Sequence, residues 1–298
     1  PYRRQRQMCI RDRAVVALVA GMYFDGLRLQ RLVKIGGYKL SIRAVLRVIF
    51  SNYFMAMLTP GASGGAVAQV LVLRSYGVPI SKGTPIVLIR TVFSIMFLVI
   101  MLPLVFLRDA IEIPYISRDM LLIFAVLAVI AALVGTYILQ TKYMRQFVYN
   151  LAQRFKAHNT KDWLSKLETL NQGLGLLYKQ PVQSLIVFIE SGLSLLCLYC
   201  IAPALMYAFT PDIPIIDILD RMILLNLILY FAPTPGGTGI AEGLFVVLFS
   251  AFVPNGTVGI IAVGWRVVAE YMPFFIGMYA VLTLYGRQFV AQETSREQ

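Results

Sequence analysis

Apolar segments separated by short polar loops fill most of the chain. A helix of roughly 18 or more apolar residues is long enough to cross a bilayer. Four segments reach that length, at residues 85–107, 120–139, 181–209 and 258–284, and a fifth at 14–29 has the character of the last part of a membrane helix. The pattern predicts a polytopic α-helical membrane protein.

Two pairs of shorter apolar segments lie between these spans, at residues 44–57 with 66–73 and at 222–232 with 240–252. A helix over 44–57 would reach only about 21 Å, whereas the hydrocarbon core is roughly 30 Å thick. Each pair is interrupted by proline and glycine, as LTPGASG from Leu58 and FAPTPGGTGIAE from Phe231. Such stretches cannot continue the backbone hydrogen bonds of an α-helix. We therefore expect two broken, re-entrant helical hairpins.

The two interruptions are copies of one pattern, T-P-G-[AG]-[ST]-G, which begins at Thr59 and again at Thr234. An arginine follows each copy at nearly the same separation, Arg90 after the first and Arg266 after the second. Six cations with no acid among them precede the first hairpin and predict a cytoplasmic loop: Arg28, Arg31, Lys34, Lys39, Arg43 and Arg47. The first hairpin then enters from the cytoplasm and the second from outside. The expected fold class is all-α with inverted-topology repeats. Repeat A covers about 44–139, repeat B covers about 218–285, and a basic cytoplasmic connector covers 142–180.

Composition supports this fold class, since 58% of the 298 residues are hydrophobic and only 14% are charged. The formal net charge of +12 comes from Lys and Arg in short loops. This favours cytoplasmic anchoring by the positive-inside rule over a nucleic-acid surface. Cys197 and Cys200 have no second cysteine pair, and the histidine, His158, lies in a distant loop. We expect no metal site and no cofactor.

The first thirteen residues, PYRRQRQMCIRDR, differ in character from the sequence that follows. We expect residues 1–13 to be foreign to the native protein. Residues 14–286 then form a single transmembrane domain, and 287–298 form a cytoplasmic tail.

Ionisable residues at membrane depth cost about 2.5–3.5 kcal/mol each on insertion scales, so each needs a partner or water. The candidates are Arg90, Glu190, Glu242, Arg266 and Glu270. Glu242 can cap the helix that begins beside it, and Arg266 can pair with Glu270 at a spacing of i, i+4. The arrangement that we favour instead has Arg90 and Arg266 face a central cavity, where the N–H groups of glycine-rich helix ends bind an anion. The common anion with an apolar body in a bilayer is a phospholipid headgroup.

Three stretches resemble the membrane domain of lysylphosphatidylglycerol synthases and the stand-alone flippase-like proteins related to it: LTPGASGGAVAQVLVLRSYGVPISKGT at 58–84, APTPGGTGIAEGLF at 232–245 and WRVVAEYMPFFIGMYAVL at 265–282. The resemblance implies movement of aminoacylated phosphatidylglycerol, or a related lipid, between leaflets. In the bifunctional relatives a soluble C-terminal domain attaches the amino acid. The sequence holds no counterpart of that domain, so we expect no synthase activity and no enzyme.

The candidate substrate-binding residues combine this resemblance with the repeat and the charges at membrane depth. The first hairpin and its following span contribute Thr59, Pro60, Gly61, Ser63, Gly64, Gly65, Gln69 and Arg90. The second contributes Thr234, Pro235, Gly236, Gly237, Thr238, Gly239, Glu242, Arg266 and Glu270.

The leading hypothesis is a lipid translocator of the bacterial plasma membrane, with membrane phospholipids as partners and no nucleic acid. The sequence has no G-x-x-x-x-G-K-[ST] motif for ATP binding, so a gradient or the membrane potential would supply any driving force. An intramembrane lipid-modifying enzyme and a non-catalytic membrane scaffold are the alternatives. A homo-oligomer and a separate lipid-modifying enzyme as a partner are left open.

Overall fold

The computed structural model describes residues 2–108, 118–138, 175 and 180–296. These residues form helices joined by short turns, and no named strand occurs among them. The first half contains α1 (Tyr2–Ile35), α2 (Ile42–Leu58), α3 (Ser63–Ser75), α4 (Ile80–Leu107) and α5 (Arg118–Ile138). The second half contains α8 (Pro181–Tyr199), α9 (Ile201–Met206), α10 (Ile215–Leu229), α11 (Ile240–Phe249), the short turn η1 (Ser250–Phe252), α12 (Val258–Arg266), the π-helical turn η2 (Val267–Tyr271) and α13 (Met272–Arg296).

Among the described residues, three helical segments are long and apolar enough to cross a membrane: Ile80–Leu107, Pro181–Met206 and Val258–Leu284. Their bounds agree with the predicted spans to within a few residues. α4 continues through Pro85 and Pro103. Many large apolar side chains on the outside of the helices are exposed, such as Val247 and Tyr279. A lipid environment covers such a surface, so the protein is an integral membrane protein.

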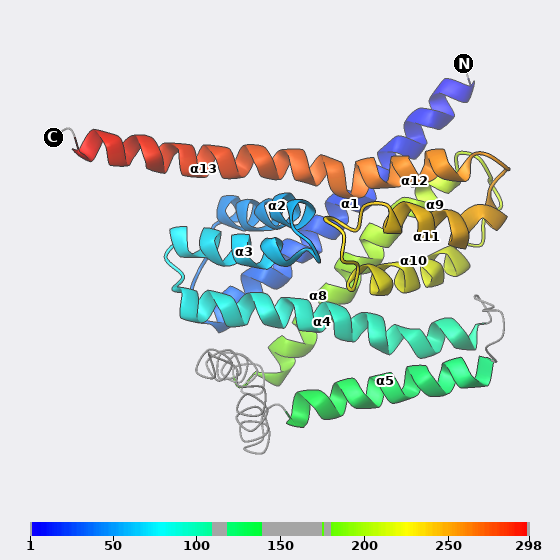
Figure 1. The fold of residues 1–298 in the computed structure, drawn as a ribbon, viewed down its shortest axis with the longest axis horizontal. Coiled ribbons are helices and arrows are strands. Elements are labelled where there is room, and N and C mark those ends of the chain that lie inside the picture. The colour runs from blue at the N-terminus through cyan, green and yellow to red at the C-terminus, as the bar shows by residue number, and fades with distance from the viewer. Residues whose placement is uncertain (1, 109–117, 139–174, 176–179, 297–298) are drawn as a thin grey trace.

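Each half has the same order of elements: a long helical segment, a hairpin of two short helices, and another long segment. In Figure 1 the α2–α3 hairpin extends from one end of the molecule and the α10–α11 hairpin from the other, and their loops meet near the middle. α4 and α12–α13 run in opposite directions in the same view. Both predicted breaks in the short helices are present.

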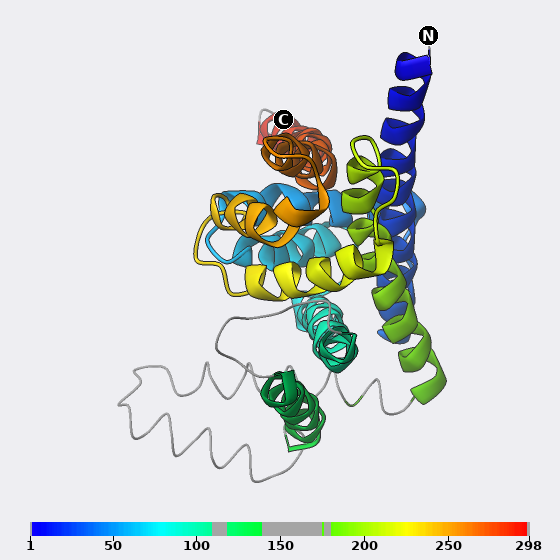
Figure 2. The ribbon, with the colours of Figure 1, turned by 90° about the vertical axis from the view of Figure 1, so that its right-hand side faces the viewer.

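Each hairpin packs against the long helix of the other half. α2 lies against α13, where the rings of Phe54 and Phe274 are 5.3 Å apart between centroids, and α10 lies against α4. Figure 2 looks along α4, α5 and α13 and shows α1 and α8 side by side. The hydroxyl of Ser194 on α8 donates to the carbonyl oxygen of Gly21 on α1 at 2.8 Å. The two halves therefore support each other at several places.

One predicted boundary is wrong. We expected the cationic residues from Arg28 onward to form a cytoplasmic loop, but α1 continues to Ile35 and buries Arg28 at 6% exposure. The physical reason is that Arg28 and Arg31 both find carboxylate partners inside the helix bundle. Residues 2–13, which we expected to be foreign, belong to α1. Most of the predicted connector at 142–180 lies outside the described residues.

Candidate functional site

The two proline–glycine loops contact each other directly. Pro60 and Pro235 form an isolated antiparallel β-bridge, although they come from opposite halves of the sequence. We refer to residues 59–64 as the first tip and residues 234–239 as the second tip. A Cβ atom on Gly236 would lie 3.3 Å from the Cα atom of Met57, at the end of α2. The motif that the sequence repeats is thus also the place where the two halves meet.

The two tips share the same local hydrogen bonds. In each, the hydroxyl side chain donates to the carbonyl of the proline three residues earlier, Ser63 to Pro60 at 3.1 Å and Thr238 to Pro235 at 2.8 Å. The next residue after each proline is a glycine with positive φ, 60° at Gly61 and 58° at Gly236. Side chains other than glycine rarely adopt that conformation. The two tips therefore share a local conformation as well as a sequence pattern.

The tips differ in how the following helix is capped. The Oγ1 atom of Thr59 accepts the N–H of Gly64 at 2.8 Å and donates to the carbonyl of Met55 at 2.9 Å. At the corresponding place in the second tip, the N–H of Gly239 donates to Oε2 of Glu242 at 2.7 Å. The Oγ1 atom of Thr234, the counterpart of Thr59, is buried and has no hydrogen-bond partner. Glu242 therefore takes the place of the threonine, and the prediction that it caps its own helix is confirmed.

Arg266 connects the second tip to the last membrane span. Its side chain is 1% exposed, and its three nitrogens donate to three different acceptors. Nε donates to Oε1 of Glu242 at 2.8 Å, Nη2 donates to the carbonyl of Gly236 at 2.9 Å, and Nη1 donates to Glu270. The predicted Arg266–Glu270 pair is confirmed. We call Glu242, Arg266 and Glu270 the Arg266 cluster; with two carboxylates and one guanidinium its formal charge is −1.

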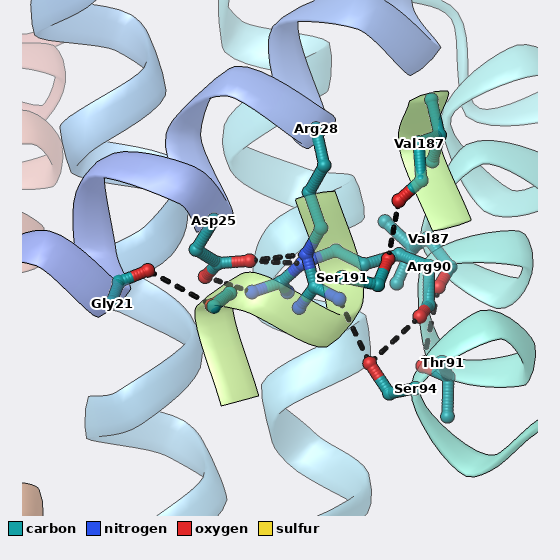
Figure 3. Close-up of polar contacts among 10 residues, drawn as sticks. Gly21, Asp25, Arg28, Val87, Arg90, Thr91, Ser94, Val187 and Ser191 are labelled. Atoms are coloured by element: carbon teal, nitrogen blue, oxygen red, sulfur yellow. Dashed lines mark hydrogen bonds and ion pairs between the residues drawn. The ribbon is translucent and has the colours of Figure 1, made fainter. Parts of the chain in front are cut away.

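Arg90 lies in a different cluster, which Figure 3 shows around Asp25. The Asp25 carboxylate accepts Nε of Arg28 at 2.5 Å and Nε of Arg90 at 3.0 Å, and it also accepts Nη2 of Arg90. Nη1 of Arg28 donates to the hydroxyl of Ser94 at 2.8 Å. All of these side chains are buried. We call Asp25, Arg28 and Arg90 the Arg90 cluster; with one carboxylate and two guanidiniums its formal charge is +1.

We expected Arg90 and Arg266 to face one central cavity, and in the structure each of the two guanidiniums is paired with carboxylates of its own cluster. Each arginine is enclosed by its own carboxylates. The phenol of Tyr53 on α2 is within electrostatic range of the charges of the Arg90 cluster and of Glu270. Tyr230, at the end of α10, interacts with Ser94 and Arg28. Two clusters of opposite charge therefore lie near the contact between the hairpins.

Sequence reasoning missed Asp25 and Arg28, although a signal was present. An aspartate inside an apolar segment, followed by an arginine at i+3, is a pair that can lie on one helix face. Glu190, another of the carboxylates predicted at membrane depth, accepts hydrogen bonds from Nε of Arg31 at 3.1 Å and from Nη2 of Arg31 at 2.8 Å. That pair has a formal charge of zero and leaves Arg31 partly exposed.

The remaining predicted site residues serve the hairpins. A Cβ atom on Gly64 would collide with the side chain of Thr59, and one on Gly65 would collide with Asn52. Gly237 has positive φ in the second tip. Gln69 on α3 is 2% exposed, and its Oε1 atom is buried without a partner. In the part of the chain that the structure describes, no group of three His, Cys, Asp or Glu side chains could hold a metal ion.

Comparison with known proteins matches a stretch of the chain that contains both tips. The model of the family described as lysylphosphatidylglycerol synthase TM region matches residues 13–277. A relative from Archaeoglobus fulgidus, a UPF0104 membrane protein, is 22% identical over 268 residues, which cover 86% of this chain and 80% of that protein. No solved structure matches the chain.

Proposed function

The chain belongs to the lysylphosphatidylglycerol synthase TM-region family, and from that premise we propose that it moves a phospholipid between the two leaflets of a bacterial plasma membrane. The family ties the chain to lipid handling. Within it we propose a translocator that is not itself an enzyme. The lipid headgroup passes through the place where the two tips meet, while the acyl chains remain in the bilayer.

The observation that carries this proposal is the β-bridge between Pro60 and Pro235. We propose that the hairpins are re-entrant and belong to inverted repeats, one entering from each side of the membrane. The opposite directions of the two hairpins in Figure 1 support this arrangement. In transporters with such repeats, substrate sites lie near the midplane, where discontinuous helices meet. The contact between the tips then closes the path, and the tips must move apart before a headgroup can pass.

The charges near the tips support a charged or dipolar cargo. Buried charges within a membrane are costly and mark substrate or ion pathways more often than scaffold. Here two charged clusters lie near one contact, and neither is neutral. A polar headgroup that crosses between them exchanges its hydration for these groups, which lowers the cost of passing the hydrocarbon core.

A disulfide across the tips tests the proposal. Residues opposite each other in an antiparallel pair have Cα atoms about 4.5–5.5 Å apart, a separation that a disulfide can span. In a protein whose native cysteines are replaced by serine, Pro60→Cys with Pro235→Cys should form a disulfide and stop the transfer of acyl-labelled fluorescent lipids in a dithionite-quenching assay on proteoliposomes. Reduction should restore the transfer.

Three controls separate this outcome from its alternatives. Each single cysteine variant should transfer lipid with and without oxidant. Val247→Cys, at a position 74% exposed on α11, should behave like the parent. Mass spectrometry of the recovered lipids should show unchanged masses, whereas a lipid-modifying enzyme would change them. Equal transfer by the disulfide-linked and the reduced protein would overturn the proposal.

A further inference from the structure

The two tips have the same fold but different caps, and this difference indicates a second arrangement of the second tip. Thr59 caps the first tip through a hydroxyl, which does not titrate at physiological pH. The second tip is capped by Glu242, a titratable group. Its own threonine, Thr234, stands at the equivalent position with a buried and unpartnered Oγ1 atom. Because buried hydroxyl groups are normally hydrogen-bonded, the free Oγ1 atom needs an explanation.

Thr234 is placed to replace Glu242 as the cap. In the first tip, the N–H of Gly64 donates to the hydroxyl of Thr59. Gly239 stands at the same separation from Thr234 as Gly64 does from Thr59. If Glu242 released the N–H of Gly239, the second tip could form the hydrogen bond that the first tip already has. The sequence repeat thus supplies a ready partner for the alternative arrangement.

The carboxylates that would have to release the tip share one arginine. The charged and titratable groups that interact with Glu270 are Arg266 from α12, Glu242 from α11 and Tyr53 from α2; α1 and α13, which also pack near η2, contribute no charge to it among the described residues. The side chains of Glu242 and Glu270 are 29% and 22% exposed, whereas Arg266 is 1% exposed. The two carboxylates are therefore the accessible members of the Arg266 cluster.

The formal charges of the two clusters cancel. The Arg90 cluster carries +1 and the Arg266 cluster carries −1, so together they are neutral. One added proton on Glu242 or Glu270 leaves a total of +1. One phosphodiester headgroup, with a charge of −1, returns the total to zero. Since net charge within a membrane is costly, the proton and the anionic headgroup each lower the cost of binding the other.

We propose that the Arg266 cluster is a proton-binding site, and that it takes up one proton when one anionic phosphodiester headgroup binds at Arg28 and Arg90. This rests on the proposed function. The proton neutralises one carboxylate and weakens the hold of the cluster on the second tip. The N–H of Gly239 then donates its hydrogen bond to Oγ1 of Thr234 in place of Glu242, and Arg266 releases the carbonyl oxygen of Gly236. The tips then separate, and the proton gradient couples to lipid movement.

The first experiment measures the tip contact without measuring transport. Purified protein in phosphatidylglycerol nanodiscs carries the cysteine pair at positions 60 and 235, and disulfide yield is followed between pH 5 and pH 8. Thiol chemistry changes with pH in every variant, so the comparison is between proteins at each pH. The disulfide yield of the parent should fall toward low pH more steeply than that of Glu270→Gln, because glutamine cannot take up a proton. Thr234→Val should also flatten the profile, because it removes the alternative cap.

The second experiment measures the proton and the lipid together. Proteoliposomes with the membrane potential clamped by valinomycin and potassium contain a pH dye, and their lipid is either phosphatidylglycerol or phosphatidylcholine. Transfer of the labelled anionic lipid by the parent should change with pH by up to about tenfold per unit, the limit for one proton. Proton uptake should accompany phosphatidylglycerol but not phosphatidylcholine. Inorganic phosphate added to the phosphatidylcholine vesicles should cause no uptake, which separates a lipid headgroup from free phosphate.

Glu190→Gln is the matched control, because Glu190, like Glu242 and Glu270, is paired with an arginine but lies in neither cluster. It should keep the pH profile of the parent. Glu242→Gln provides a second variant if Glu270→Gln fails to fold. Lipid transfer with equal pH profiles in the parent, Glu270→Gln and Glu242→Gln would overturn the proton site and leave the proposed function standing. A pH-dependent tip contact without transfer of any lipid would instead overturn the proposed function.

Discussion

Nη2 of Arg266 donates to the carbonyl oxygen of Gly236 at 2.9 Å, so a side chain of a membrane span holds the backbone of the second tip. The same guanidinium also binds Glu242 and Glu270, with its three nitrogens directed to three acceptors. The planar guanidinium can donate hydrogen bonds to all three acceptors at once, whereas the ammonium of lysine is a compact point charge on a flexible side chain. The tip position therefore depends on the shape of the arginine as well as on its charge.

Arg266→Lys is expected to abolish most lipid transfer although it preserves the charge. Arg266→Ala should in addition destabilise the protein by about 3–5 kcal/mol, the usual cost of removing one partner of a buried ion pair. Transfer in proteoliposomes and thermal unfolding in detergent measure the two effects. A lysine variant with the transfer rate of the parent would show that charge alone is sufficient at this position.

The breaks in the short helices could be predicted because they depend on local chemistry. Proline lacks the N–H that a helix needs, and Gly61 and Gly236 accept a positive φ that other side chains avoid. The lengths of the apolar segments similarly determine which helices can span a membrane. These features need no knowledge of tertiary contacts, and the helix bounds agree with the prediction to within three residues except at α10, which begins at Ile215 and not at residue 222.

The partners of the charged residues could not be predicted in the same way. Asp25 and Arg90 are 65 residues apart, and Arg31 and Glu190 are 159 apart. Counting cations between apolar segments assigned Arg28 and Arg31 to a loop, since that method ignores their carboxylate partners, Asp25 on the same helix and Glu190 on α8. The pairs within one helix or one hairpin, such as Arg266 with Glu270, were accessible because their spacing fixes their geometry.

Asp25→Asn and Arg28→Met should have different effects on stability, because they change the charge of the Arg90 cluster in opposite directions. Asp25→Asn leaves two buried guanidiniums without a carboxylate, +2 in place of +1, and should cost about 3–5 kcal/mol. Arg28→Met leaves the neutral pair of Asp25 and Arg90, so its unfolding temperature should stay closer to that of the parent.

The rate of anionic lipid transfer should show whether the Arg90 cluster binds the headgroup or only stabilises the fold. Arg28→Met is expected to be folded but slow, since it removes the excess positive charge that the headgroup would meet. If it moves phosphatidylglycerol as fast as the parent, the Arg90 cluster has only a structural role. A greater loss of stability in Arg28→Met than in Asp25→Asn would contradict the charge argument.

Thr59→Val tests the cap of the first tip. Valine has nearly the same shape as threonine but cannot accept the N–H of Gly64. An unsatisfied buried N–H costs about 1–3 kcal/mol, so Thr59→Val should be destabilised by that amount in thermal unfolding. Thr59→Ser keeps the hydroxyl and should lie within about 0.5 kcal/mol of the parent, the range of ordinary mild substitutions. Equal losses in the two variants would indicate that the methyl group matters and the hydrogen bond does not.

Gly192 on α8 tests the packing between the two halves. A Cβ atom there would lie 2.5 Å and 2.7 Å from ring carbons of Phe97, which is 6% exposed and is packed against Phe188. The ring has little room to move, so Gly192→Ala should cost about 1–3 kcal/mol, as overpacking of a core does.

Gly243 on α11 is the matched control, because a Cβ atom there meets nothing within 4 Å. Gly243→Ala should be neutral or stabilising by up to about 1 kcal/mol, since alanine favours helix more than glycine does. Thermal unfolding of both variants decides the matter, and equal unfolding temperatures would show that α8 can move away from α4 at little cost.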